Sequence, residues 1–221
     1  MGRLSIVATP IGNLEDITLR ALRTLKECDV IFAEDTRVIS KLLAHYQIQK
    51  PLQRLDAAME GKRAEQIIER IEGGEHVVYV SDAGTPGISD PGARLVAAVR
   101  GAQQRIDAIP GASALTAALS IAGLDSPEFT FLGFLPHKKG RQTALKEIAT
   151  SERPVVLYES PHRILKLLSE VASHMPERIV VVAKEITKIH EAVYRGTAVD
   201  VSEHLVADKA DRGEFVVIVG T

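Results

Sequence analysis

Charged side chains gather where two strands are predicted to end in the second half of the chain. Because the ends of adjacent strands converge in space, we expect these side chains to line one polar cleft. Activating a weakly acidic hydroxyl requires a carboxylate or an amine within hydrogen-bond reach of its proton. The candidates for that task are Glu159, Lys184, Glu185 and Lys188. Structural ion pairs use the same residue types, so both interpretations stay open at this point.

A second candidate site is residues 81–92, which we call the glycine loop. It contains three glycines, two prolines and two aspartates, and it follows a predicted buried strand. Open α/β sheets bind their ligands at the carboxyl ends of strands, and glycine lets backbone approach a ligand closely. Asp90 and Pro91 are expected to cap the next helix. An elaborate strand-to-helix turn is the alternative interpretation.

Several common catalytic motifs are missing from the chain. Ala93 and Arg94 stand where a P-loop requires Lys and Ser or Thr, and no G-x-G-x-x-G fingerprint is present. The segment from Gly111 to Leu115 lacks the second glycine of a nucleophile elbow. None of the seven histidines forms a tight ligand pair. These observations argue against a triphosphate, dinucleotide, serine-hydrolase or metal site.

A basic segment runs from Pro136 to Lys166, with seven Lys and Arg residues against three Glu residues. Its densest part lies in a predicted loop that could reach phosphates. The basic side chains of most interest are Lys138, Lys139, Arg141 and Arg163. A solvated loop and helix face would show the same pattern, so charge alone does not decide between the two interpretations.

Strands must position these groups, and short apolar runs alternate with helical patterns in the rhythm of βαβ units. The strands are predicted at 4–8, 30–33, 76–81, 106–109, 129–134, 155–159, 179–184, 192–194 and 215–219. Helices are predicted around 39–46, 64–71, 113–123 and 201–205, and after Ser160 as N-cap with Pro161 at the first helical position. Asp35 or Thr36 is expected to cap the helix after the second strand. A turn-rich stretch at 124–128 predicts two domains, 1–123 and 124–221.

Composition sets the broad class. The chain has 221 residues, of which 45% are hydrophobic and 25% charged, with a net charge of −2. These values are ordinary for a globular protein and provide no global attraction to nucleic acid. The single cysteine, the lack of a signal-peptide pattern and the lack of a long apolar run lead us to expect a cytoplasmic protein without a membrane span. The absence of tryptophan and the 4% aromatic content weaken the idea of an aromatic base-stacking platform.

Taken together, the motifs resemble the ribosomal RNA small subunit methyltransferase I family of the tetrapyrrole methylase superfamily. The residues that carry the resemblance are 9–14, 33–37, 81–92, 109–114, 135–138, 158–163, 184–188 and 213–216. The resemblance implies an α/β protein of two αβα domains, a homodimer, and S-adenosylmethionine (SAM) in the cleft between the domains. It also implies methyl transfer to the ribose 2′-hydroxyl of a cytidine in the decoding region of small-subunit rRNA, as naked RNA or in the assembled subunit.

The resemblance also implies roles for individual residues. The cofactor would be held largely through backbone contacts by Pro10, Ser81, Asp82, Ala83, Gly84, Ile88, Ser113 and Ala114. The acceptor side would use Glu159, Lys184, Glu185 and Lys188. RNA phosphates would be held by Lys138, Lys139, Arg141 and Arg163. No metal is implied.

Two other functions remain open from the sequence. A tetrapyrrole methylase acting on a small molecule would belong to the same superfamily, but those enzymes typically open with G-x-G-P-G-D, whereas this chain has Thr9-Pro10-Ile11-Gly12-Asn13. A catalytically inactive RNA-binding relative is the other alternative. It is suggested by the stretch from Leu55 to Arg63, which departs from a His-Glu-His-Asn-like stretch usual in the family, and by the chain ending at Thr221.

Overall fold

The structure is a computed structural model that describes residues 2–221 and divides into two compact units, Met1–Ser113 and Ala114–Thr221. We describe each unit by itself. The division lies earlier than the predicted boundary between 123 and 124, because the helix that follows Ser113 groups with the second unit. That helix, α5 (Ala114–Ile121), contacts the last strand of the chain, β10 (Phe215–Val219).

The first unit is built on a five-stranded sheet in which every neighbouring pair is parallel. Its strands are β1 (Arg3–Val7), β2 (Val30–Ala33), β3 (Leu52–Arg54), β4 (His76–Val80) and β5 (Ile106–Ile109). Their order is β3-β2-β4-β1-β5. The parallel sheet predicted from the βαβ rhythm is confirmed, whereas β3 was not predicted, because three residues are too few to show a period.

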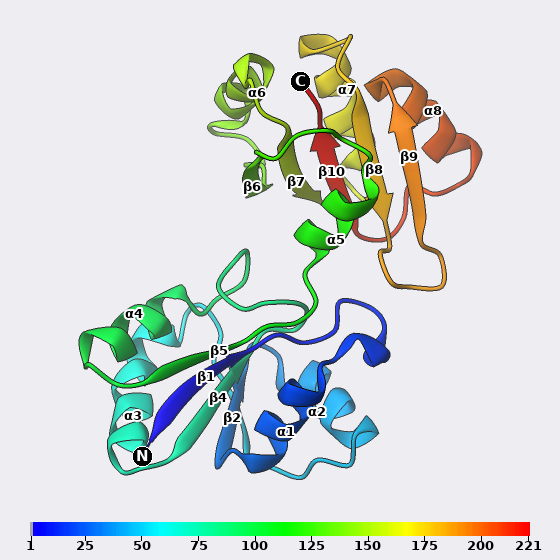
Figure 1. Ribbon diagram of the computed structural model, residues 1–221. Coiled ribbons are helices and arrows are strands. Elements are labelled where there is room, and N and C mark those ends of the chain that lie inside the picture. The colour runs from blue at the N-terminus through cyan, green and yellow to red at the C-terminus, as the bar shows by residue number, and fades with distance from the viewer. Residues whose placement is uncertain (1) are drawn as a thin grey trace. The chain divides into compact units, whose positions relative to one another are not determined.

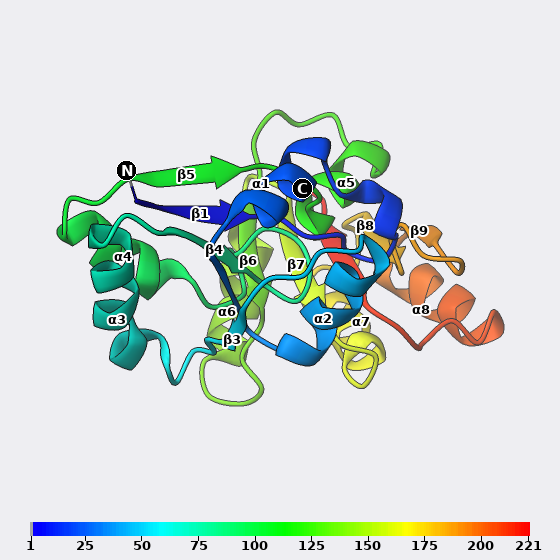
Figure 2. The same cartoon turned by 90° about the horizontal axis from the view of Figure 1, so that it is seen from below.

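Helices cover both faces of the first sheet (Figure 1 and Figure 2). They are α1 (Leu19–Glu27), α2 (Thr36–His45), α3 (Glu60–Glu72) and α4 (Ala93–Gly101). A short 3-10 helix, η1 (Leu14–Asp16), precedes α1 and has no buried residue. Helices α1 and α2 share one hydrophobic cluster with the sheet, and α3 and α4 share a second one. The Asp35 side chain caps α2 by accepting from the Arg37 N–H, as predicted.

The second unit has a mixed five-stranded sheet in the order β6-β7-β10-β8-β9. The new strands are β6 (Thr130–Phe134), β7 (Val155–Glu159), β8 (Val180–Lys184) and β9 (Ala192–Gly196). Only β6 and β7 run parallel, and the other three pairs are antiparallel. Because β10 is the last strand of the chain and lies between β7 and β8, it separates two strands that the sequence led us to treat as neighbours.

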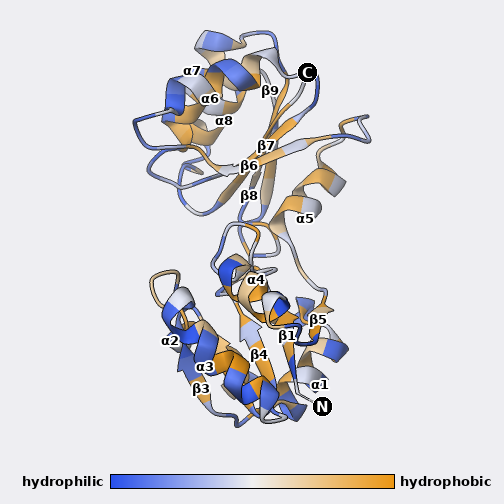
Figure 3. Cartoon of the chain, turned by 90° about the vertical axis from the view of Figure 1, so that its left-hand side faces the viewer, coloured by the Kyte–Doolittle hydropathy of each residue, from blue (hydrophilic) through white to orange (hydrophobic). Residues whose placement is uncertain are grey.

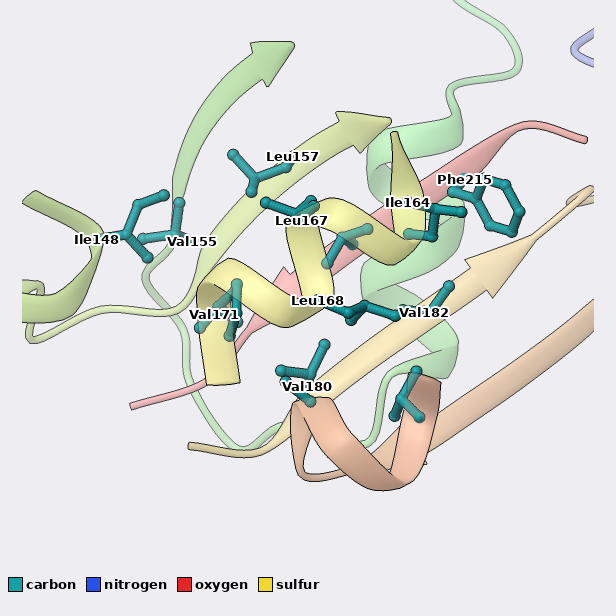
Figure 4. Packing of buried hydrophobic residues seen from close by; sticks show 14 of the residues in the cluster. Ile148, Val155, Leu157, Ile164, Leu167, Leu168, Val171, Val180, Val182 and Phe215 are labelled. Atoms are coloured by element: carbon teal, nitrogen blue, oxygen red, sulfur yellow. The ribbon is translucent and has the colours of Figure 1, made fainter. Parts of the chain in front are cut away.

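Three helices pack on one face of the second sheet: α6 (Arg141–Thr150), α7 (Ile164–His174) and α8 (Ala198–Ala207). Figure 4 shows their contact, in which Leu167 and Leu168 of α7 lie over Leu157 and Val182 of the strands. The strands of both units are mainly hydrophobic (Figure 3), as expected for strands that pack against helices. Within residues 2–221, no helix is long and apolar enough to cross a membrane.

The predicted start of α7 is wrong. Ser160 and Pro161 lie in a turn, and the helix begins at Ile164 with Arg163 at its N-cap. The Ser160 carbonyl accepts hydrogen bonds from the N–H groups of Arg163 and Ile164 at 3.0 and 3.1 Å. The turn therefore supplies the acceptor through its backbone, and the Ser160 hydroxyl does not cap the helix.

Candidate functional site

The glycine loop follows β4 and lies beside the segment that follows β1. The Thr9 N–H donates to the Gly84 carbonyl at 2.9 Å, and the Gly84 N–H donates back to the Thr9 carbonyl at 3.1 Å. Gly84 has a φ of +78°, and a Cβ there would lie 3.3 Å from the Ile11 side chain, so glycine suits this position. Helices change from one face of the sheet to the other between these two strands, which is where open α/β sheets bind ligands.

Two hydroxyl groups stabilise the base of the glycine loop. Ser81 is fully buried, and its hydroxyl lies 3.3 Å from the carbonyls of both Ala83 and Gly84. The Thr9 hydroxyl donates to the Ser81 carbonyl at 3.2 Å. Ser81, a predicted cofactor residue, therefore uses its side chain to shape the loop. Thr9 was not among the predicted site residues, although its place directly after β1 could have indicated it.

The far end of the glycine loop is anchored by a buried carboxylate. Glu60 accepts hydrogen bonds from the N–H groups of Gly92 at 2.7 Å and Leu95 at 3.2 Å. Helix α4 begins after Gly92, which has a φ of +133° and no side-chain cap of its own. The prediction that Asp90 and Pro91 cap this helix is wrong, because Glu60 from α3 supplies the acceptor instead. Glu60 lies within the 55–63 stretch that departs from the usual family pattern.

Carboxylates surround a buried phenol beneath the glycine loop. The Tyr79 hydroxyl is buried and has no hydrogen-bond partner among the described residues. Burial, then Glu34 and other nearby carboxylates, raise the pKa of Tyr79. Burial and the charges of Asp82 and Asp90 raise the pKa of Glu34. Burial also raises the pKa of Asp90, partly offset by the Ser81 hydroxyl. The region therefore has negative potential and one unsatisfied polar atom.

Hydrogen bonds gather most of the predicted cofactor residues into one group. The Asp82 carboxylate accepts from the Asp35 N–H at 2.9 Å, which ties the glycine loop to the end of β2. The Thr85 hydroxyl donates to the Ala112 carbonyl at 3.4 Å, which ties it to the segment after β5. Ser113 follows directly in that segment, and Pro10 follows the bridged Thr9. Of the remaining predictions, Ala83 lies within the loop, Ile88 is exposed at its tip, and Ala114 opens α5.

In the second unit, the Glu159 carboxylate at the end of β7 is fully buried between two arginines. One oxygen, Oε1, accepts from the Ser160 N–H at 2.8 Å and lies 3.2 Å from Arg163 Nε. The other, Oε2, lies 4.0 Å from Arg141 Nη2 and has no hydrogen-bond partner within residues 2–221. This arrangement is a structural ion pair, and it encloses the carboxylate rather than presenting it to a substrate.

The same two arginines hold the start of the basic segment. Arg141, only 4% exposed, donates to Glu170 at 2.6 and 2.8 Å and to the Pro136 carbonyl at 3.2 Å. Arg163 donates to the Leu135 carbonyl at 2.6 Å. Both guanidinium groups were predicted to hold RNA phosphates, but in the structure they bind acceptors within the same unit, namely carboxylates and backbone carbonyls. Lys138 and Lys139, between these anchors, are exposed.

A compact charged turn follows β8, as predicted. Glu185 Oε1 accepts from Lys188 Nζ at 2.9 Å and from the Glu214 N–H at 2.8 Å, and Lys188 also reaches the Glu214 carboxylate at 2.8 Å. Burial disfavours the Glu185 carboxylate, but these donors outweigh burial and lower its pKa. Burial opposes the Lys188 charge as well, but the two carboxylates raise its pKa. Both groups are therefore charged near neutral pH, and Glu214 is a member that the predicted set missed.

The backbone of this turn is strained. Glu185 and Thr187 have φ values of +50° and +69°, which non-glycine residues seldom adopt. The Thr187 hydroxyl is buried and lacks a hydrogen-bond partner in the part of the chain that is described. Strain of this kind persists where the surroundings hold it in place, and it clusters at functional sites. Lys184 precedes the turn and is half-buried.

The four predicted acceptor-side residues do not lie on adjacent strands. Glu159 and Lys184 both pair with Phe215, from opposite sides of β10. Two strand spacings separate their backbones, which amounts to about 10 Å. The structure thus brings Glu185 and Lys188 into contact and places Lys184 beside them, whereas Glu159 belongs to the arginine cluster. Among the described residues, no group of His, Cys, Asp and Glu side chains is arranged to hold a metal ion.

A comparison with protein families matches residues 3–202 to the model described as Tetrapyrrole (Corrin/Porphyrin) Methylases. Ribosomal RNA small subunit methyltransferase I from Xylella fastidiosa is 49% identical, with 99% of this chain and 81% of that protein covered. The protein of the same name from Thermotoga maritima is 43% identical, with 99% and 98% covered. These matches extend through both units.

Solved structures share the fold at low sequence identity. Diphthine synthase aligns with a TM-score of 0.77 at 19% identity, covering 99% of this chain and 90% of that one. The methyltransferase CobJ aligns with a TM-score of 0.72 at 22% identity, covering 100% and 95%. Uroporphyrin-III C-methyl transferase from Thermus thermophilus, complexed with S-adenyl homocysteine, aligns at 0.67 and 18% identity, covering 99% and 97%.

Proposed function

We propose that this chain, which belongs to the tetrapyrrole methylase family, acts within that family as a methyltransferase of small-subunit (16S) ribosomal RNA. Its methyl donor is SAM, as in that family. The finer part of the proposal is the acceptor, the ribose 2′-hydroxyl of a cytidine in the decoding region. The observation that carries the proposal is the match to named rRNA methyltransferases over nearly the whole chain, through both units.

The residues of the first unit fit a cationic cofactor. The buried Tyr79 hydroxyl lacks a partner within the described residues, and the nearby carboxylates of Glu34, Asp82 and Asp90 favour a positive charge. When bound, SAM supplies a methyl group already activated on a sulfonium. The residues proposed to hold it, largely through backbone groups, are Pro10, Ser81, Asp82, Ala83, Gly84, Ile88, Ser113 and Ala114.

The second unit supplies groups suited to handling the acceptor proton. Glu185 keeps its carboxylate unprotonated at neutral pH because its pKa is lowered, which also makes it a weaker base than an ordinary carboxylate. It can still take the proton once the hydroxyl oxygen has begun to bond to the methyl group, because that proton then becomes strongly acidic. Lys188 remains charged and fixes that carboxylate through a contact of 2.9 Å. We assign proton acceptance to Glu185, its orientation to Lys188 and positioning of the hydroxyl to Lys184. Glu159 takes no part in this assignment, since two arginines enclose it.

RNA binding is assigned to the exposed part of the basic segment. Lys138 and Lys139 are open to solvent and can approach phosphates, which attract lysine through charge. Arg141 and Arg163 act indirectly, because their internal hydrogen bonds hold the backbone on which the lysines are carried. We further propose that the protein acts as a homodimer in the cytoplasm, and sedimentation of the purified protein tests the first of these two statements.

The experiment that tests the function is transfer of labelled methyl from SAM to small ribosomal subunits that lack this modification, with naked rRNA alongside. A 2′-O-methyl group removes the hydroxyl that attacks the neighbouring phosphate. Alkaline hydrolysis of the product should therefore leave labelled, alkali-resistant dinucleotides. Label absent from both RNAs, despite SAM binding measured by calorimetry, would overturn the proposal in favour of a small-molecule methylase or an inactive relative.

A matched pair of variants tests the residue assignment. Glu185→Gln should abolish methyl transfer and leave SAM affinity unchanged, because the amide keeps the shape but does not accept the proton. Glu203→Gln changes an exposed carboxylate on α8 and serves as the control, with activity equal to that of the wild type. If Glu185→Gln loses SAM binding instead, Glu185 belongs to the cofactor site.

A further inference from the structure

Three aromatic side chains form a group on β6 and β7, which we call the aromatic triad: Phe131, Phe134 and Tyr158. The ring centroids of Phe131 and Tyr158 are 5.0 Å apart, and those of Phe134 and Tyr158 are 5.7 Å apart. Both pairs meet edge to face, which is a favourable arrangement for aromatic rings. The chain has only nine Phe and Tyr residues and no Trp, so a third of its aromatic side chains lies at one spot.

A β-bulge creates the triad. Phe131 pairs with Val156 and Phe134 pairs with Tyr158, while the register shifts between Phe131 and Gly133. Residues three apart on a regular strand point to opposite faces, but one extra residue, Leu132, brings Phe131 and Phe134 to the same face. The sequence pattern hides this arrangement, and it therefore gave no reason to expect an aromatic platform.

The triad lies on the face of the sheet away from α6, α7 and α8. The alternating β7 residues Val155 and Leu157 point into the core beneath those helices, so Tyr158 points to the other side. Strand β6 is at the edge of the sheet. Phe134 is 55% exposed, whereas its two ring neighbours are half-buried. The two neighbours thus support Phe134 and leave much of it open to solvent.

Positive charge adjoins the aromatic triad. Strand β6 runs directly into the loop that contains the exposed residues His137, Lys138 and Lys139. Arg163 holds the start of this loop through the Leu135 carbonyl, and Arg141 holds it through the Pro136 carbonyl. An exposed ring, followed along the chain by exposed lysines on a loop whose backbone is anchored, is complementary to a chain that carries both flat bases and phosphates. A wholly apolar protein partner would leave these lysines without partners.

We propose that the aromatic triad and the lysines at 138 and 139 form a binding site for an unpaired stretch of the RNA substrate. One base stacks on Phe134, and the lysines contact the flanking phosphates. A paired helix hides the faces of its bases, so the site selects single-stranded RNA. This inference rests on the proposed function and deepens it, because it specifies how the substrate is recognised and which conformation it must adopt.

The absence of tryptophan makes the first test direct. Phe134→Trp places a single indole in the triad, and stacking of a base on it should quench its fluorescence. We expect quenching by a single-stranded oligoribonucleotide, and little by inorganic polyphosphate or by a duplex of the same sequence. Val206→Trp on α8 is the matched control, since Val206 is 57% exposed and lies on one of the helices of the opposite face. Its fluorescence should not respond to any of these additions.

Affinity and kinetics provide the second test. Phe134→Leu should weaken oligoribonucleotide binding by about tenfold and raise the KM for RNA with little change in kcat. Phe134→Tyr, which keeps the ring, should restore both values, and Val206→Ala should match the wild type. Unchanged binding and KM in Phe134→Leu would overturn the site, while methyl transfer by the wild-type enzyme would leave the proposed function standing.

Three other outcomes would also overturn this inference. Equal quenching of Phe134→Trp by polyphosphate and by oligoribonucleotide would show that the site binds phosphates by charge and does not stack a base. Quenching by SAM alone would assign the triad to the cofactor. A fluorescence change that depends on protein concentration without RNA, together with a changed sedimentation coefficient of Phe134→Leu, would assign it to a contact with a second copy of the chain.

Discussion

The two units hold their functional loops by different means. In the first unit, every strand is parallel, so the carboxyl ends of β1, β4 and β5 lie at one edge and their loops bond to each other mainly through backbone groups. In the second unit, β10 separates β7 from β8, and charged side chains hold the loops after them. A parallel sheet gathers main-chain groups around a small ligand, whereas a mixed sheet leaves side chains to build and orient the site.

If charge holds the second unit together, Arg141→Ala should have the largest effect. It removes the buried guanidinium that pairs with the partly buried Glu170, and it leaves the buried Glu159 with Arg163 as its one arginine partner. Breaking a buried pair costs about 3–5 kcal/mol of unfolding free energy. Urea denaturation followed by circular dichroism measures the loss. Arg153→Ala is the control, because its pair with Glu128 is exposed and should contribute at most about 1 kcal/mol. Equal losses in the two variants would show that burial of the pair adds nothing.

In the first unit, the corresponding variant is Glu60→Ala, which removes the acceptor for the N–H groups of Gly92 and Leu95. We expect a loss of about 1.5–3 kcal/mol, since these hydrogen bonds are buried and involve a charged group. SAM affinity, measured by calorimetry, should fall because the glycine loop loses its anchor. Glu60→Gln keeps one carbonyl oxygen and should lose less. Glu65→Ala, on the exposed side of α3, should leave both stability and affinity unchanged.

Acid should weaken the first unit through His76, which is buried beside Ser5 and Arg3 at distances of 2.8 and 3.1 Å. Burial, and then Arg3, lower the pKa of His76. The unfolded chain binds this proton below about pH 6.5, whereas the folded unit resists it to a lower pH. The stability that depends on neutral His76 is therefore present above that pH and is lost as the pH falls through the folded pKa.

The measurement is the urea midpoint on either side of about pH 6.5. His76→Gln should show a smaller decrease on acidification than the wild type, and the exposed His45→Gln should show the same decrease. If the urea midpoint of His76→Gln fell on acidification as far as that of the wild type, the acid sensitivity would belong to other groups.

The smallest change in stability is expected for Lys188→Met in the turn after β8. The ammonium group is partly exposed, and the Glu214 partner is mostly exposed, so the loss should be within about 1 kcal/mol. Methyl transfer should nevertheless fall strongly, because the Glu185 carboxylate loses its orienting partner. A variant that is stable and fully active would remove Lys188 from the proposed machinery.

Local patterns predicted most elements of the fold. The runs at 30–33, 155–159 and 215–219 match β2, β7 and β10 in their bounds, because buried strands show dense apolar runs. The run at 106–109 also matches β5, although only Ile109 of that strand is buried. The local patterns gave wrong helix starts where a group outside the expected cap supplies the hydrogen-bond acceptor. The cap of α4 is Glu60 from another helix, and α7 starts after a turn whose backbone carbonyl replaces the predicted Ser160 cap.

The sequence by itself determined the α/β class, the parallel first sheet, the family resemblance and the residue types at the strand ends. Only the tertiary structure decided that β10 lies between β7 and β8 and that arginines enclose Glu159. It also decided that a bulge places Phe131 and Phe134 on the same face of the sheet. The physical reason is the separation along the chain of the residues that interact. Periodicity and turn chemistry reflect neighbours along the chain, whereas strand order, burial of a charge and register depend on segments that meet only after folding.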